Sequence, residues 1–172
     1  RYTTEQPPPR LISLPVRAER SFTLPPGTPI TTDAVWFAAA SAAAVSSAAS
    51  APLPAGPLAI DVVVTIDDAS TYRPLGVIKA LLDGTVASLH RHDGTDLDQL
   101  APRLAEKLGV DATVVRGLLV GGGLGARRLL YLRGDGVQWN PADDGLAHIS
   151  CSVVRAGPAL DLCVLARVGA AP

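Results

Sequence analysis

The sequence predicts an α+β fold, with a mixed sheet of about six strands and about three helices in a single domain. Three observations support this class. A nearly continuous run of Val and Ile over 59–66 is typical of a buried strand. Apolar residues at helical spacing follow over 75–89. Short strand-like segments, separated by Gly and Pro, then occupy most of the chain after residue 114.

The amino-terminal part predicts an arm, one or two strands and a helix. Residues 1–10 are polar and Pro-rich, which favours a flexible arm, so the α+β domain is expected over 11–172. Apolar residues alternate well enough over 11–24 for short strands. Asp33 is expected to be the N-cap of the first helix. That helix would carry Val35, Trp36, Ala39 and Ala43.

The central strand is expected to lead into an amphipathic helix. Pro74 suits its first turn, because the N–H that proline lacks would have no partner there. Lys79 and Asp83 are four residues apart and therefore neighbours on the helix surface. Gly84 costs roughly 1 kcal/mol relative to Ala, which predicts a short or bent helix. One face would carry Leu75, Ile78, Leu82, Val86 and Leu89.

A third helix and several strands are predicted after this helix. Leu residues at helical spacing over 97–108 indicate the helix, and Gly109 is its natural C-cap. Strands are expected over 114–120, 126–133 and 137–139, and a closing antiparallel pair over 148–154 and 160–168.

Composition excludes several classes of protein. The 15 Lys and Arg residues against 16 Asp and Glu residues give a net charge of −1, so no general basic field attracts nucleic acid or an anionic membrane. No run of 18 apolar residues occurs, which excludes an ordinary membrane span. We expect a cytoplasmic protein. Cys151 and Cys163 lack the neighbours of a zinc site and are expected to be buried free thiols.

Three local motifs have simple structural explanations. The glycines of 121–125 lack the GK[ST] ending of a phosphate-binding loop and favour a flexible hairpin. Asp143 and Asp144 are typical of a solvated turn. Arg127 and Arg128, with Arg133, form the one basic concentration on a predicted strand and suit a phosphate or a surface carboxylate equally.

The candidate site is the cluster His90, Arg91, His92 and Asp93 at the end of the central helix. On an extended segment the two histidines would point the same way. With Asp93 they could hold a divalent metal or act as acid and base. The alternative is a solvated helix end, where histidine near the last carbonyls is mildly favourable.

The chain resembles the RusA-type Holliday-junction resolvases over residues 33–94. The succession is an Ala-rich helix with Trp36, the turn PLPAGP, the strand LAIDVVVTI and the helix VIKALLDG. In that family a strand leads into a DxDN-x-x-K-x-x-x-D helix, and an acidic pair follows. The resemblance implies that Lys79 is the motif lysine, Asp83 the helix aspartate and Asp93 a member of the later pair.

The motif is only partly present. Arg73, Leu75 and Gly76 occupy the positions of its first two aspartates and its asparagine. Those aspartates belong to the Mg²⁺ site that activates water in the family. Asp67 and Asp68, slightly upstream, are the candidates to replace them.

The motif can also be aligned with the chain in a second register. It uses Asp96 and Asp98 as the first element and Glu106 below them. It lacks the lysine and no predicted strand directly precedes it, so the first register is preferred.

The resemblance implies a homodimeric, Mg²⁺-dependent endonuclease that acts on branched DNA. Its catalytic residues would be Lys79, Asp83 and Asp93, and its metal ligands Asp83, Asp93, Asp67 and Asp68. Contacts to nucleic acid would come from Arg73, His90, Arg91 and His92.

Two alternatives compete with the nuclease. In the first, the fold is kept without the chemistry, giving a protein-binding or adaptor module whose partner is unknown. The absence of the motif's first two aspartates and the net charge of −1 favour this alternative. In the second, an unrelated α+β enzyme uses His90 and His92.

Overall fold

The fold is that of a computed structural model, which describes residues 18–25, 27–45, 58–66, 74–121, 124–141, 146–155 and 162–170. The predicted arm at 1–10 lies outside these residues, as do the acidic turn at 143–144, Asp67, Asp68 and Arg73. The elements are β1 (Ala18–Leu24), α1 (Thr32–Val45), β2 (Leu58–Ile66), α2 (Pro74–Leu89), β3 (His90–His92), α3 (Leu97–Leu108), α4 (Ala112–Val120), β4 (Leu124–Arg127), β5 (Leu130–Arg133), β6 (Gly136–Trp139), β7 (Leu146–Arg155) and β8 (Leu162–Ala170).

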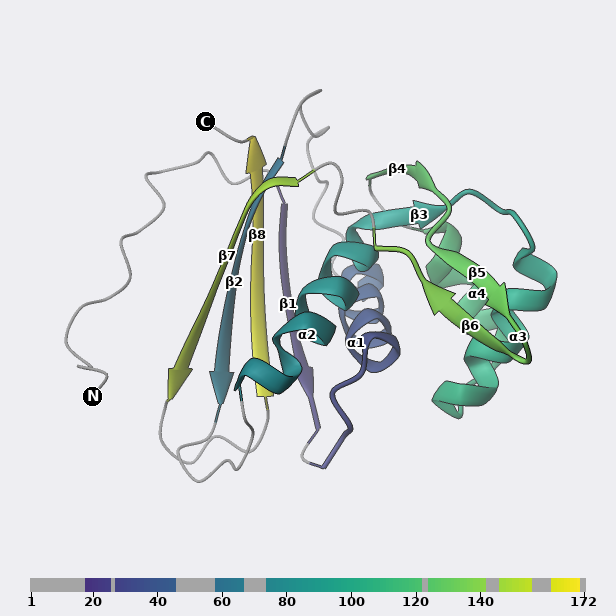
Figure 1. Cartoon of the computed structure of the whole chain (residues 1–172), viewed down its shortest axis with the longest axis horizontal. Helices are drawn as coiled ribbons and strands as arrows, with labels where there is room; N and C mark the ends of the chain where they lie inside the picture. Colours follow the sequence, from purple (N-terminus) through teal and green to yellow (C-terminus); the bar gives the residue numbers. More distant parts are fainter. Residues whose placement is uncertain are drawn as a thin grey trace.

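A four-stranded mixed sheet forms one side of the molecule, in the order β1-β8-β2-β7 (Figure 1). β8 is antiparallel to both β1 and β2, while β7 runs parallel to β2. The predicted central strand is confirmed as β2. Its alternate residues Ile60, Val62 and Val64 are buried, as the period of two in a strand requires.

Helices α1 and α2 cover one face of this sheet (Figure 1). The first core lies between them and the strands. It contains Phe22 and Leu24 of β1, Val35 and Ala39 of α1, Ile60, Val62 and Val64 of β2, Leu81, Val86 and Leu89 of α2, and Val164 of β8.

A second layer packs on the other side of the two helices. We call residues 90–141 the peripheral unit; it contains β3, α3, α4, β4, β5 and β6. The second core joins it to Trp36 and Ala40 of α1 and Ala87 of α2. Helix α1 therefore serves both cores, since its buried residues face two sides.

Helices α1 and α2 approach closely at Gly84. A Cβ atom at this position would lie 2.7 Å from Cβ of Val35 and 2.8 Å from the carbonyl oxygen of Thr32. Helix α2 runs unbroken through Gly84, so of the predicted alternatives, a short or a bent helix, the short one is wrong. The glycine is explained by helix packing, because it alone leaves room for α1.

The predicted number of strands in one sheet is wrong. Four strands form the mixed sheet, and two separate two-stranded sheets are formed by β3 with β4 and by β5 with β6. The predicted single strand 126–133 is split between these two small sheets, with a break at Arg128 and Leu129.

The predicted closing pair is also wrong. The segments 148–154 and 160–168 correspond to β7 and β8, but these two strands lie on opposite sides of β2. Each forms its ladder with β2, so neighbours in the sequence are separated in the sheet.

Four helices are described instead of about three, because residues 114–120 belong to α4. The run of Val and Leu suggested a strand. However, Val115 and Leu119 are the buried residues, and their spacing of four is helical. The third predicted helix, α3, and its C-cap Gly109 are confirmed.

Asp33 is not the N-cap that was predicted. The helix begins at Thr32, and the hydroxyl of Thr31 accepts a hydrogen bond from the N–H of Ala34. Asp33 lies in the first turn, and its carboxylate is buried. None of the helices in the described ranges is long and apolar enough to cross a membrane.

Candidate functional site

Lys79 and Asp83 form an ion pair on the surface of α2. Nζ of Lys79 lies 2.8 Å from Oδ2 of Asp83. The predicted proximity is confirmed, since residues four apart share a helix face. The Lys79 side chain is 83% exposed, so the pair is open to water at its lysine end, whereas the Asp83 side chain is only 18% exposed. Pairs at the surface contribute only about 0–1 kcal/mol. The pair places one cation beside one carboxylate.

Asp93 lies beyond the carboxyl-terminal end of α2. The helix rises roughly 9 Å between Asp83 and Leu89, and β3 then leads away toward the peripheral unit (Figure 1). Within the described ranges, no group of three or more His, Cys, Asp or Glu side chains is arranged to hold a metal. Asp83 and Asp93 therefore form no Mg²⁺ site with other described residues. The other predicted ligands, Asp67 and Asp68, lie outside these ranges, as does Arg73.

The carboxylate of Asp93 organises its own loop. Its Oδ1 accepts a hydrogen bond from the N–H of Thr95 at 2.9 Å. This bond lowers the pKa of Asp93, and the hydroxyl of Thr95 and the charge of Arg128 lower it further. Asp93 is thus kept ionised at neutral pH as part of a turn.

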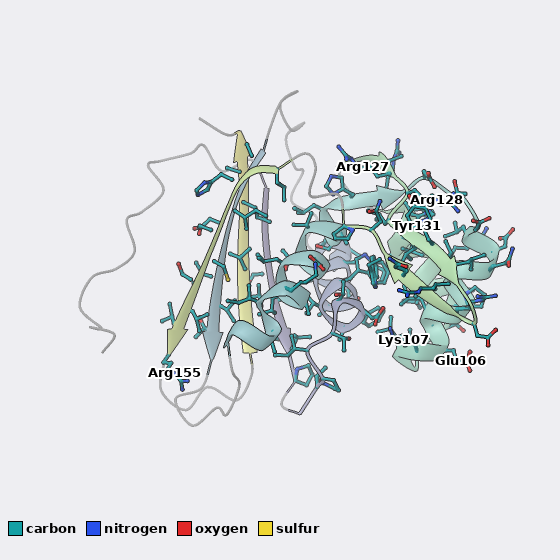
Figure 2. The ribbon with its side chains drawn as sticks, viewed as in Figure 1. Glu106, Lys107, Arg127, Arg128, Tyr131 and Arg155 are labelled. Atoms are coloured by element: carbon teal, nitrogen blue, oxygen red, sulfur yellow. The ribbon has the colours of Figure 1, made fainter. Side chains whose placement is uncertain are left out.

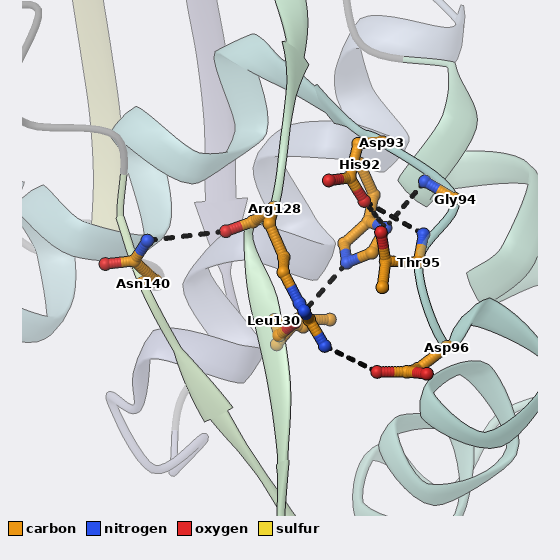
Figure 3. Close-up of polar contacts among 8 residues, drawn as sticks. All are labelled: His92, Asp93, Gly94, Thr95, Asp96, Arg128, Leu130 and Asn140. Carbon is orange, nitrogen blue, oxygen red and sulfur yellow. Dashed lines mark hydrogen bonds and ion pairs between the residues drawn. The ribbon is translucent and has the colours of Figure 1, made fainter.

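The two histidines of β3 point into the protein, while Arg91 between them is exposed. The prediction that they point the same way is confirmed. Nδ1 of His90 donates to the carbonyl oxygen of Val86 at 3.1 Å. Nδ1 of His92 accepts from the N–H of Gly94 at 3.0 Å, so Nε2 carries the hydrogen and faces the carbonyl oxygen of Leu130 at 3.5 Å (Figure 3). Both rings are buried, so the alternative prediction of a solvated helix end is wrong. For the same reason neither ring lies on the surface that a nucleic acid would touch.

Arg128 connects several segments of the peripheral unit through its contacts (Figure 3). Its Nη2 donates to Oδ2 of Asp96 at 2.5 Å, and its guanidinium lies 4.5 Å from the centre of the Tyr131 ring. The side chain of Asn140 donates to the main-chain carbonyl of Arg128. Arg128 and Asp96 are 32 residues apart, so no local sequence pattern indicates the pair.

A second polar bridge joins the layers. Oδ2 of Asp33 lies 2.5 Å from Nζ of Lys107, and its Oδ1 accepts from Nε1 of Trp139 at 2.8 Å. The Trp139 ring lies 5.3 Å from that of Trp36. This bridge ties α1 to α3 and β6, and the sequence analysis missed it because its members are scattered along the chain.

Helices α3 and α4 form a helix-turn-helix pair. A three-residue turn, Gly109–Asp111, joins them, and Gly109 adopts the left-handed conformation with φ of 68°. Oδ1 of Asp111 then caps α4 by accepting from the N–H of Thr113 at 2.7 Å. The hairpin β5–β6 follows, and Arg103 of α3 donates to the carbonyl oxygen of Gly134 at its turn. A helix-turn-helix pair with an adjoining hairpin is an arrangement that often presents its second helix to a partner.

The second helix presents few charges. We call its exposed residues the α4 surface: Thr113, Val114, Arg116, Gly117 and Val120. Val114 and Val120 are 47% and 48% exposed. Nη1 of Arg116, the one charged residue among them, lies 2.5 Å from Oδ1 of Asp98.

The basic residues in the described ranges are dispersed. Seven Lys or Arg residues between 90 and 141 are balanced by six Asp or Glu residues. Lys107 and Arg128 are paired with carboxylates, and Figure 2 places them at different positions on the peripheral unit. Arg155 lies on the far side of the molecule, at the end of β7 (Figure 2). The described surface therefore has no concentrated positive field.

No protein-family model, curated protein or solved structure matches this chain.

Proposed function

We propose that this chain is a non-catalytic protein-binding module, and that its contact surface is the α4 surface. The observation that supports this function is the combination of a helix-turn-helix pair with exposed valines on its second helix. Apolar side chains held on a rigid helix suit packing against another protein. The partner is a protein that places apolar side chains against Val114 and Val120.

Charge favours protein over DNA as this partner. The commonest and strongest base contacts in the major groove are bidentate and come from Arg, Lys, Asn or Gln side chains on the helix that enters the groove. The α4 surface has one such residue, Arg116, and this residue is engaged by Asp98. Binding to phosphates would also require several available cations, whereas the charges of the peripheral unit nearly cancel.

The first experiment is affinity capture from a lysate of the source cells, with Val114→Lys and Val120→Lys as variants. We expect a protein captured by the unaltered chain to be lost with either variant. Ile149→Lys is the matched control, because Ile149 is 41% exposed but lies on β7 of the sheet. Retention of the same protein by both α4 variants would contradict the proposal.

A DNA-binding measurement completes this test. Fluorescence anisotropy with a labelled duplex and a labelled four-way junction, at about 0.1 M salt, should detect no binding at protein concentrations below about 1 μM. Binding in this range that weakens steeply with added salt would replace the protein partner by DNA.

A second candidate function is the RusA-like nuclease acting on branched DNA. The observation in its favour is that Lys79 and Asp83, which have the spacing of the motif's lysine and helix aspartate, lie together on one face of α2. Its Mg²⁺ would be held by Asp83 and Asp93 together with Asp67 or Asp68. Dimerisation and a cytoplasmic location stay predictions under either function.

The nuclease is tested by incubating a labelled four-way junction with the chain and Mg²⁺ or Mn²⁺. Cleavage that is absent in Asp83→Asn would establish catalysis and overturn the non-catalytic proposal. Because Asn has nearly the shape of Asp and the Lys79 side chain is 83% exposed and can be rehydrated, this variant should fold normally. No cleavage by either protein is the result we expect.

A further inference from the structure

Among the strands that the structure describes, β7 lies at an edge of the main sheet. One of its edges pairs with β2, and no strand in the described ranges pairs with the other (Figure 1). An irregularity in its pairing with β2 leaves an extra residue at Ala147, so residues 148–155 form the regular part. The main-chain N–H and C=O groups along such an edge are a template for another strand.

The sequence of β7 lacks the usual features that block edge pairing. Natural edge strands are short, or carry Pro, Lys or inward-pointing charges. β7 has ten residues, no Pro and no Lys, and Arg155 at its end is its only Lys, Arg, Asp or Glu. Instead it exposes Ile149, Val153 and Val154 by 41%, 37% and 45%.

The first core is open at this edge. In the register with β2, Ile149, Cys151 and Val153 lie opposite Ile60, Val62 and Val64 and share the helix-covered face. The three β2 residues are buried, and Cys151 packs against the same core. Ile149 and Val153 extend the core to the edge, where described residues leave them partly uncovered.

The spacing of these residues is symmetric about Cys151. We propose that a second copy of this chain pairs with β7 in an antiparallel manner, with Cys151 on the twofold axis. Ile149 then lies opposite the partner's Val153, and Ser150 lies opposite the partner's Ser152. The helix-covered face of the joined strands thus brings together apolar residues, while the other face pairs the serines and places His148 opposite the partner's Val154.

Other registers match less well. A shift by one residue places Ile149 opposite the partner's Ser152 or Val154, depending on its direction, and in both cases turns the helices of the two copies to opposite faces. A shift by two residues in either direction separates Ile149 from the partner's Val153. The proposed register also keeps the two Arg155 side chains at opposite ends of the pair, which avoids opposing like charges.

The oligomeric state tests the proposal directly. Sedimentation over a dilution series should show a concentration-dependent dimer of the unaltered chain. Ile149→Lys and Val153→Lys should each shift it to monomer at the same concentrations, with circular dichroism confirming that both variants are folded. Val114→Lys is the matched control, because Val114 has similar exposure on α4 and should leave the dimer intact.

Cys151 reports the register. Residues directly opposite in an antiparallel pair have Cα atoms about 4.5–5.5 Å apart, which is within the range for a disulfide. Mild oxidation with copper phenanthroline should therefore link two chains through Cys151. Burial raises the pKa of this thiol, and the charge of Asp61 raises it further, so the reaction is run at about pH 8.5. Cys163→Ser should retain the link and Cys151→Ser should lose it while remaining dimeric.

Three results would overturn this inference. They are a monomer at every concentration, a dimer that survives both lysine variants of β7, and a dimer whose oxidation does not link Cys151. The outcome is distinguishable from failure of the proposed function, since Val114→Lys affects capture of the partner protein and Ile149→Lys affects the dimer.

Discussion

Gly84 is the residue at which packing most clearly overrides local preference. A methyl group there would contact Val35 and the main-chain oxygen of Thr32 at under 3.0 Å. Ala is favoured over Gly in a helix by about 1 kcal/mol, but overpacking a tight contact costs about 1–3 kcal/mol. We predict that Gly84→Ala lowers the free energy of unfolding by about 1–2 kcal/mol, measured by urea denaturation.

Gly117 provides the control for this prediction. It lies within α4, and a Cβ atom there would meet nothing within 4 Å. Gly117→Ala should therefore raise the free energy of unfolding by about 0.5–1 kcal/mol. A stabilising effect of both substitutions would show that α1 moves away from α2 at little cost.

Asp33 is the residue that links the two layers through charge. Its buried carboxylate is bonded by Lys107 and Trp139, and hydrogen bonds to charged groups contribute about 1.5–3 kcal/mol. Asp33→Asn keeps an acceptor for Trp139 but removes the charge opposite Lys107, whose side chain is 55% exposed and can be rehydrated. We predict a loss of about 1–2 kcal/mol in urea denaturation. The same substitution in the open pair, Asp83→Asn, should cost less than about 1 kcal/mol.

At the scale of elements, α4 shows where sequence patterns fail. Its residues Val114 and Val115 followed by Leu118 and Leu119 have the composition of a buried strand. The helical conformation is stabilised instead by the Asp111 cap and by the packing of Val115 and Leu119 into the second core. Helices α2 and α3 were predictable because their apolar residues recur at helical spacing over 16 and 12 residues. The burial of Ala87 of α2 in the second core was not part of that pattern.

The Asp111 cap gives a prediction of pH dependence. Hydrogen bonds from the hydroxyl and N–H of Thr113 lower the pKa of Asp111 below its ordinary value of 3.8. A lowered pKa means stabilisation that is present above this ordinary value and is lost as the pH falls through the folded-state pKa. We predict that Asp111→Ala lowers the urea midpoint at pH 7, and that its difference from the unaltered chain narrows as the pH falls below the ordinary pKa of 3.8.

Asp111→Asn is the control for the pH series. Asn retains an oxygen that can cap the helix but does not titrate. Its midpoint should lie nearer that of the unaltered chain at pH 7. A constant deficit of Asp111→Ala across the series would assign its effect to something other than the ionised cap.

The candidate site was predictable only where its residues are close in the sequence. The Lys79 and Asp83 contact and the inward direction of His90 and His92 follow from helix and strand periods. The Arg128 and Asp96 pair depends on how the break between β4 and β5 is placed beside the start of α3, which no local pattern specifies. The nuclease roles of Lys79, Asp83 and Asp93 stay predictions.

For the whole molecule, the sequence predicts elements better than their order in the sheet. Strands β7 and β8 follow each other closely, and consecutive strands usually pair. Here β8 lies between β1 and β2 instead, which gives the sheet its order. The Val-rich β2 accommodates this because ladders form along both of its edges.

The sharing of α1 between two cores predicts how the whole molecule unfolds. Val35 and Ala39 belong to the first core, while Trp36 and Ala40 belong to the second, so neither core can open without disturbing the same helix. We predict that the slowest-exchanging amides of β2 and of α3 report the same free energy of opening in native-state hydrogen exchange. Asp33→Asn should lower both values together, because Asp33 joins α1 to Lys107 and Trp139. A lower opening free energy for α3 than for β2 in the unaltered chain would instead show that the peripheral unit unfolds by itself, with the sheet still closed by α1 and α2.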